Sequence, residues 1–214
     1  SLAMLFDNWK EDLQPLMDKY SNRKHPLAYQ NTYQLLIMVL LSAQDSDANI
    51  NVITTPFFEK YPTIRSLSIA TNPDIEAYLY TVENYKNKMI WLVELANDLM
   101  TDENIPTNLT DLTALKGIGR KSANVILREI NKKPEGIIVD LHVIRVAPRI
   151  GLTLPHKDGN KIEKQLMDKL PYEMWNEIGM ALSFLGREIC RPTNPVCKVC
   201  PVNSVCIYYT NNIK

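Results

Sequence analysis

Lys121 follows two glycines that lie one residue apart, at the start of a segment with helical periodicity. Gly117 and Gly119 can adopt backbone angles that other residues avoid, and neither places a side chain between the main chain and a ligand. Backbone N–H groups at the start of a helix attract an anion such as phosphate, and the helix dipole adds to this attraction. The spacing therefore predicts either a phosphate-binding turn or a plain tight turn between two helices.

The same turn gives Lys121 the surroundings of a nucleophile. Arg120 and the predicted helix N-terminus create a positive potential there, which favours the neutral amine of the lysine. A neutral amine can attack the electrophilic C1′ carbon of a sugar and continue through a Schiff base. The sequence therefore makes Lys121 the candidate catalytic nucleophile.

Asp140 is the candidate acid–base group. It follows the apolar residues 137–139 and lies nineteen positions after Lys121. An ionised carboxylate there could stabilise an oxocarbenium-like sugar or take the proton from an amine. Asp140 also precedes a predicted helix at residues 141–149 and could cap it, and one side chain can serve both roles.

The four cysteines gather at the end of the chain with the spacing Cys190-x6-Cys197-x2-Cys200-x5-Cys206. In a protein that we expect to be intracellular, this clustering around a C-x2-C pair favours a metal site over disulfides. Four thiolates suit either Zn²⁺ or an iron–sulfur cluster, and the spacing alone leaves both open. Zinc ribbons usually pair two C-x2-C knuckles, whereas this run has one, so the cluster is favoured.

Charge is balanced over the whole chain but not along it. Residues 1–115 hold 8 basic and 15 acidic residues, whereas residues 116–214 hold 16 basic and 9 acidic residues. A polyanion would therefore meet the second half, although zero net charge is unusual for a nucleic-acid-binding domain. The longest apolar run, residues 35–41, is far shorter than the roughly 20 residues that cross a bilayer, and no secretory leader opens the chain.

The periodicity predicts an all-α fold. Glycines are few, alternation of β-branched residues is nearly absent, and prolines fall mostly between apolar-periodic segments. Residues 33–43 are apolar on nearly every face, which predicts the central core helix. Further helices are predicted at residues 5–20, 109–115, 141–149, 160–170 and 172–185, and Pro148 is expected to kink or stop the helix that contains it.

The core helix ends in an abruptly polar segment. Gln44 follows it directly and is placed to present a rigid amide to a groove. Asp45, Ser46 or Asp47 can cap the next helix, so Asp47 has a structural interpretation beside that of a ligand contact.

Three of these segments and the cysteine tail resemble one known family. Residues 115–123, residues 139–146, the C-x6-C-x2-C-x5-C run and residues 40–47 resemble, in order and spacing, the helix-hairpin-helix DNA glycosylases of the endonuclease III type, within the HhH-GPD superfamily. The resemblance covers essentially the whole chain, and its motifs are highly specific as a set.

The resemblance implies a two-domain, all-α fold that flanks a DNA-binding cleft. A six-helix barrel with the helix-hairpin-helix would span residues 27–135. Residues 1–26 and 136–214 would form the second domain, in which Cys190, Cys197, Cys200 and Cys206 hold a [4Fe–4S] cluster. The protein would be a cytoplasmic, nucleoid-associated monomer without a membrane partner, acting on double-stranded DNA that contains damaged bases or abasic sites.

The implied activity is base-excision repair by a bifunctional DNA glycosylase and AP lyase. Lys121 would form the Schiff base and Asp140 would activate it, with oxidised pyrimidines as substrates. Gln44 would fill the gap left by the flipped nucleotide, since a flipped base loses a few kcal/mol of stacking. The expected DNA contacts are Gln44, Asp47, Asn84, Lys116, Gly117, Ile118, Gly119, Arg120, His142 and Arg145.

Departures from the family pattern leave alternatives open. Lys116 replaces a proline, and Glu83-Asn84-Tyr85 replaces a Gly-Leu/Phe-Tyr pattern, so an apolar wedge is lost and an acid enters a DNA-facing surface. A monofunctional alkyl-base or mismatch glycosylase is one alternative, and a non-catalytic helix-hairpin-helix DNA-binding protein with a structural cluster is another. The presence of both Lys121 and Asp140 favours the bifunctional enzyme, while the preferred lesion and opposite base stay open.

Overall fold

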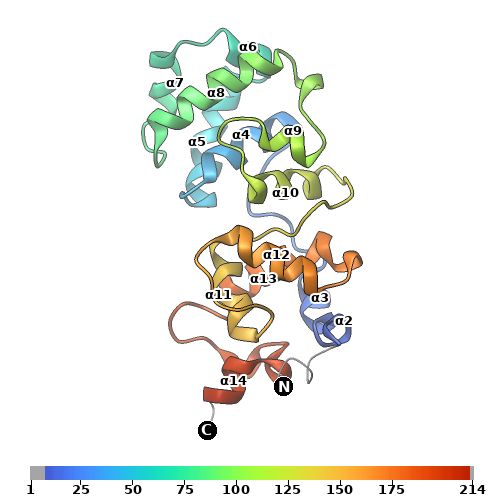
Figure 1. The fold of residues 1–214 in the computed structure, drawn as a ribbon. Coiled ribbons are helices and arrows are strands. Elements are labelled where there is room, and N and C mark those ends of the chain that lie inside the picture. The colour runs from blue at the N-terminus through green and yellow to red at the C-terminus, as the bar shows by residue number, and fades with distance from the viewer. Residues whose placement is uncertain (1–7, 213–214) are drawn as a thin grey trace. The chain divides into compact units, whose positions relative to one another are not determined.

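The computed structural model describes residues 8–212, and every regular element in this range is a helix. The predicted all-α class is therefore confirmed (Figure 1). The α-helices are α2 (Trp9–Asp12), α3 (Gln14–Tyr20), α4 (Thr32–Ser42), α5 (Asp47–Lys60), α6 (Ile64–Ser68), α7 (Asn72–Leu79), α8 (Tyr85–Leu99), α9 (Leu109–Thr113), α10 (Arg120–Glu129), α11 (Leu141–Ile150), α12 (Gly159–Lys169), α13 (Trp175–Glu188) and α14 (Ile207–Asn212). Short 3-10 helices are η1 (Asp102–Asn104), η2 (Tyr172–Met174), η3 (Cys197–Val199) and η4 (Asn203–Val205).

The chain divides into two compact units. One is the continuous segment Lys24–Lys132, and the other combines the described residues of Ser1–Arg23 with those of Lys133–Lys214. In this second unit, α3 from the start of the chain packs against α13 from near its end. Within residues 8–212, no helix is long and apolar enough to cross a membrane.

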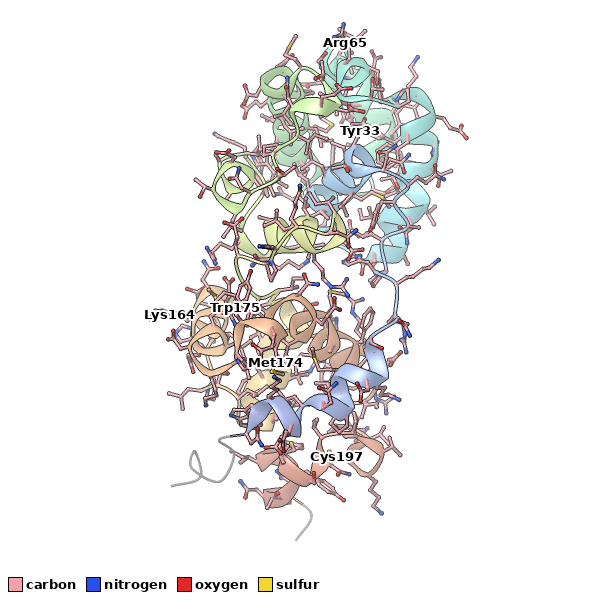
Figure 2. The ribbon with its side chains drawn as sticks, turned by 90° about the vertical axis from the view of Figure 1, so that its right-hand side faces the viewer. Tyr33, Arg65, Lys164, Met174, Trp175 and Cys197 are labelled. Atoms are coloured by element: carbon pink, nitrogen blue, oxygen red, sulfur yellow. The ribbon has the colours of Figure 1, made fainter. Side chains whose placement is uncertain are left out.

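Helix α4 forms the centre of the continuous unit. Its apolar side chains from Leu35 to Leu41 are all buried, with at most 2% exposed, because α5, α8 and α10 pack around it. Tyr33, labelled in Figure 2, donates its buried hydroxyl to the carbonyl oxygen of Tyr61 at 2.7 Å. The predicted core helix at residues 33–43 is thus confirmed, with bounds displaced by one residue.

Two glycines let α13 approach its neighbours closely in the second unit. A Cβ atom at Gly179 would lie 2.3 Å from the carbonyl oxygen of Ile138, and one at Gly186 would lie 2.9 Å from Cβ of His142. Both positions therefore require a residue without a side chain. Helix α13 consequently packs tightly along α11 and the segment that precedes it.

The helices predicted at residues 109–115 and 172–185 are observed at Leu109–Thr113 and Trp175–Glu188, the latter preceded by η2, and two further expectations differ from the structure. The helix expected at residues 5–20 is interrupted at Leu13, which separates α2 from α3, and residues 5–7 lie outside the described range. The expectation that Pro148 would stop α11 is wrong, since the helix continues for two residues beyond this proline. The helix ends at Ile150, where Gly151 adopts a left-handed conformation with φ of 102°.

Candidate active site

The glycine turn joins α9 to α10 (Figure 1). Gly117 has φ of 85°, and a Cβ atom there would lie 2.9 Å from Cε3 of Trp91, so both backbone and packing require glycine. Gly119 has an extended backbone, and nothing lies within 4 Å of the position that its Cβ would take. Packing within this unit therefore does not require glycine at position 119. The absence of a side chain there leaves the backbone accessible to a ligand.

The start of α10 has the properties of an anion site. No side chain caps this helix, whereas Asn31, Ser46 and Asn108 cap α4, α5 and α9. Arg120 and Lys121 occupy its first turn, where positive charge opposes the helix dipole. An anion bound here would accept hydrogen bonds from amides of the first turn and would neutralise this repulsion.

The side chains of this turn divide between surface and core. Lys116 and Lys121 are exposed, and Arg120 is half-buried. Ile118 is 4% exposed and its N–H donates to the carbonyl oxygen of Leu115 at 3.2 Å, so it anchors the turn.

A histidine that sequence reasoning missed lies in the same neighbourhood. Nδ1 of His25 accepts a hydrogen bond from the Leu27 N–H at 3.0 Å. Burial is the main cause that lowers the pKa of His25 to about 4, and Lys121 also lowers it while Asp47 raises it. His25 is therefore neutral at pH 7, and the predicted residues Asp47 and Lys121 both act on it electrostatically.

The loop that carries Gln44 is fastened by a buried lysine. Nζ of Lys88 donates to the carbonyl oxygens of Leu41 at 2.7 Å and Ala43 at 2.5 Å. These carbonyls belong to the C-terminal end of α4, which has no further helical donors to pair them. Lys88 is 1% exposed, and burial lowers its pKa.

Asp45 ties this loop to the loop that precedes α8. Its carboxylate accepts hydrogen bonds from the N–H groups of Ser46 and Glu83 and from the side chain of Asn49. Burial acts to raise the pKa of Asp45, but these hydrogen bonds outweigh it and lower the pKa. The chain thereby holds residues 42–46 beside residues 83–84.

Gln44 and Asn84, both predicted DNA contacts, have exposed side chains and left-handed backbones, with φ of 61° and 57°. Such angles are uncommon outside glycine and gather at functional sites. Ser46 caps α5 by accepting from the Asn49 N–H, so the interpretation of Asp47 as the cap is wrong. Asp47 is instead the first residue of that helix.

In the other unit, Asp140 caps α11 as predicted. Its Oδ1 accepts from the Val143 N–H at 2.9 Å, and its Oδ2 accepts from the Ser183 hydroxyl. Nη2 of Arg187 lies 3.9 Å from the same Oδ2. Sequence reasoning missed Ser183, although its spacing from Gly179 and Gly186 marks a small-residue face on one helix.

The predicted DNA contacts on α11 are both half-buried. Arg145 donates to the carbonyl oxygens of Gly186 at 2.7 Å and Cys190 at 3.2 Å, and burial lowers its pKa. One of its nitrogens lies 3.2 Å from Nδ1 of His142. Their contact with DNA stays a prediction.

All four cysteines are free thiols that line one pocket, with Ile150, Leu185 and Ile189 among its apolar walls. Cys197 is labelled in Figure 2. Burial raises the pKa of Cys200 to about 11 and also raises that of Cys206. Among the described residues, no three possible ligands converge tightly enough for a single metal ion.

Arg149 is a further residue that sequence reasoning did not single out. It donates to the carbonyl oxygens of Arg191 at 2.8 Å and Pro192 at 3.1 Å, and lies 3.5 Å from Sγ of Cys190. Its guanidinium also lies 5.2 Å from the ring centre of Tyr208. The end of α11 thereby holds the loop that carries the first cysteine.

Comparison with known proteins identifies the family. A sequence model of the HhH-GPD superfamily of base excision DNA repair proteins matches residues 37–172. The chain is 31% identical over 182 residues to an endonuclease III of Synechocystis sp., which covers 84% of this chain and 83% of that protein.

Solved structures agree in fold over nearly the full length. A trapped endonuclease III–DNA covalent intermediate, described as an estranged-adenine complex, matches with a TM-score of 0.86 and 30% identity, covering 96% of this chain and 97% of that one. A non-covalent endonuclease III–DNA complex matches with a TM-score of 0.85 and 31% identity, covering 95% of each chain. The resemblance predicted from the glycine turn, Asp140 and the cysteine spacing is thus confirmed, and the chain belongs to the HhH-GPD superfamily of base excision DNA repair proteins.

Proposed function

We propose that this chain is a bifunctional DNA glycosylase and AP lyase in which Lys121 is the nucleophile. The observation that carries the proposal is the exposed Lys121 in the first turn of α10, a helix whose start has no side-chain cap and follows an unobstructed glycine. A phosphate at that helix start would fix the sugar beside the lysine. The similarity to endonuclease III, including a covalent DNA intermediate of that protein, supports this assignment.

The chemistry begins when the Lys121 amine attacks C1′ of the damaged nucleotide. A bond forms between Nζ and C1′, and the glycosidic bond breaks, so the base leaves with the bonding electrons and takes up a proton. In this proposal Asp140 would be the group that accepts the amine proton, and its carboxylate would stabilise positive charge on the sugar. Opening of the sugar gives the Schiff base, after which loss of a C2′ proton expels the 3′ phosphate by β-elimination.

DNA binding by the remaining predicted residues belongs to the same proposal. Gly119 and the first amides of α10 would contact a phosphate, with Lys116 and Arg120 adding positive charge. Gln44 and Asn84 would enter the space that a flipped nucleotide leaves, since both amides are exposed on loops joined through Asp45. Asp47, Gly117, Ile118, His142 and Arg145 complete the set.

We also infer that the four cysteines hold a [4Fe–4S] cluster. Four free thiols line one pocket, and four cysteine thiolates are the usual ligand set of a [4Fe–4S] cluster. When bound, the cluster would hold the cysteine loops in place. An absorbance shoulder near roughly 400 nm, with about four irons per chain, would support it, whereas colourless protein with zinc would contradict it.

Borohydride trapping on a duplex with one abasic site tests the proposed nucleophile. Reduction of the Schiff base joins protein to DNA, so the wild type should give a covalent adduct. The adduct should disappear with Lys121→Ala and persist with Lys86→Ala, which alters an exposed lysine on α8. Absence of an adduct with the wild type would rule out the lyase assignment.

The substrate, assembly and location are finer parts of the proposal. We infer oxidised pyrimidines as lesions, a monomer as the active form and the cytoplasmic nucleoid as the location. Release of oxidised, alkylated and mismatched bases from matched duplexes ranks the lesion classes, and light scattering measures the assembly. Preferred release of alkylated bases without strand cleavage would instead indicate a monofunctional glycosylase.

A further inference from the structure

Both oxygens of the Asp140 carboxylate are engaged, and the donors come from different helices. Val143 on α11 donates its N–H to Oδ1 at 2.9 Å, and Ser183 on α13 donates its hydroxyl to Oδ2 at 2.5 Å. A helix cap requires the first hydrogen bond alone. The second bond is therefore an addition to the cap, and it comes from a residue 43 positions away.

In this second bond the Ser183 hydroxyl is the donor, and the neighbouring arginine occupies it as an acceptor. Nε of Arg187 donates to Oγ of Ser183 at 3.4 Å, so a lone pair of the hydroxyl is already in use. A serine hydroxyl has one proton, and the Asp140 carboxylate accepts it. Arg187, Ser183 and Asp140 thus form a chain of hydrogen bonds that ends on the carboxylate.

The packing of α13 fixes where Ser183 lies. Ser183 is fully buried, with 0% exposed, and shares a helix face with Gly179 and Gly186. A side chain at either glycine would collide with residue 138 or with α11. The small residues therefore let α13 approach α11 closely enough to bring the Ser183 hydroxyl to the carboxylate.

We propose that Ser183 is a positioning residue for Asp140, which fixes the plane and orientation of the carboxylate for proton transfer. The proposal rests on the catalytic role proposed for Asp140. One bond to Oδ1 leaves the carboxylate free to rotate about its terminal torsion, whereas bonds to both oxygens fix it. Each oxygen keeps an acceptor site, so the carboxylate can still take a proton.

Single-turnover kinetics on an abasic-site duplex test this role. Ser183→Ala should lower the rate constant of strand cleavage by roughly 10-fold or more, because a hydrogen bond to a charged group is lost, while the dissociation constant for DNA stays unchanged. Ser183→Thr retains the hydroxyl and should keep most of the rate. Ser183→Cys has nearly the shape of serine but donates weakly, so it repeats the Ala test if that variant folds poorly.

The same substitution made in an Asp140→Asn variant distinguishes a positioning role of Ser183 from a purely structural one. In Asp140→Asn the effect of Ser183→Ala on the residual rate should vanish, because the hydroxyl then has no carboxylate to orient. Thr153→Val is the matched control, since it removes a buried hydroxyl with no hydrogen-bond partner from the same unit. It should leave the rate unchanged.

Two outcomes would overturn the proposal. One is an Ser183→Ala rate within twofold of the wild type, and the other is an equal loss of rate in the wild-type and Asp140→Asn backgrounds. Both are measured against a wild type that forms the borohydride adduct. Failure of the wild type to form the adduct refutes the proposed lyase function itself, so the two failures are distinguishable.

Discussion

Lys88→Met tests how the chain holds the loop that carries Gln44. Methionine keeps the length of the buried side chain but removes the ammonium that pairs the carbonyl oxygens of Leu41 and Ala43. A buried carbonyl left without a partner costs about 1–3 kcal/mol, which applies to Leu41, whereas the hydrogen bond to the exposed Ala43 is only partly buried and adds less. Methionine avoids burying a charge, which places the expected loss near 2–3 kcal/mol.

The loss should be visible both globally and locally. Urea unfolding followed by circular dichroism gives the free energy of unfolding, and hydrogen exchange of the peptide spanning residues 32–46 should accelerate. Lys86→Met is the matched control, because Lys86 lies exposed on the same helix, and its effect should stay within about 0.5 kcal/mol. Equal stability and equal exchange in the two variants would refute the role assigned to Lys88.

Three further predictions follow from individual side chains. Gly117→Ala should destabilise the chain by at least about 1–2 kcal/mol, because φ is 85° and Trp91 is too close, as measured by urea unfolding. Gly119→Ala should leave stability within about 0.5 kcal/mol but weaken binding to an abasic-site duplex, and an unchanged dissociation constant would contradict the phosphate site. The pKa of His25, about 4 in the fold against an ordinary 6.5, means that only the unfolded chain gains its proton between these values. Protonation of His25 in the unfolded chain should therefore lower the free energy of unfolding by up to about 3 kcal/mol as the pH falls from 6.5 to 4. If a His25→Gln variant shows the same pH dependence of unfolding, this assignment is wrong.

Local patterns predicted much of the fold. The apolar run at residues 33–43 required a helix surrounded by others, and α4 is buried on nearly all sides. The position of Asp140 before an apolar-periodic segment predicted a helix cap, and its carboxylate accepts the Val143 N–H. Both features depend on neighbours a few residues away, which periodicity and capping rules describe.

Pairings across the sequence were not predictable in this way. Lys88 pairs with a carbonyl 47 positions away and Ser183 with a carboxylate 43 positions away. In the sequence, a lysine that follows a polar segment and precedes an apolar one resembles any exposed helical lysine, and a lone serine gives no sign of its partner. The prediction of Asp47 as the helix cap was wrong for a related reason. Asp45, Ser46 and Asp47 are all residue types that can cap a helix, and their capping preferences do not identify which one does.

Contacts with helix α11 give the cysteine tail a structural role in addition to the proposed cluster. The ten-residue helix is about 15 Å long, with Asp140 at its first end and Arg149 near its last. Arg149 holds the loop at Cys190, and Ile207 packs where a side chain at Gly151 would otherwise lie. Removal of the tail from an engineered version would therefore expose and loosen the far end of the helix that carries Asp140, so the tail is not a detachable module.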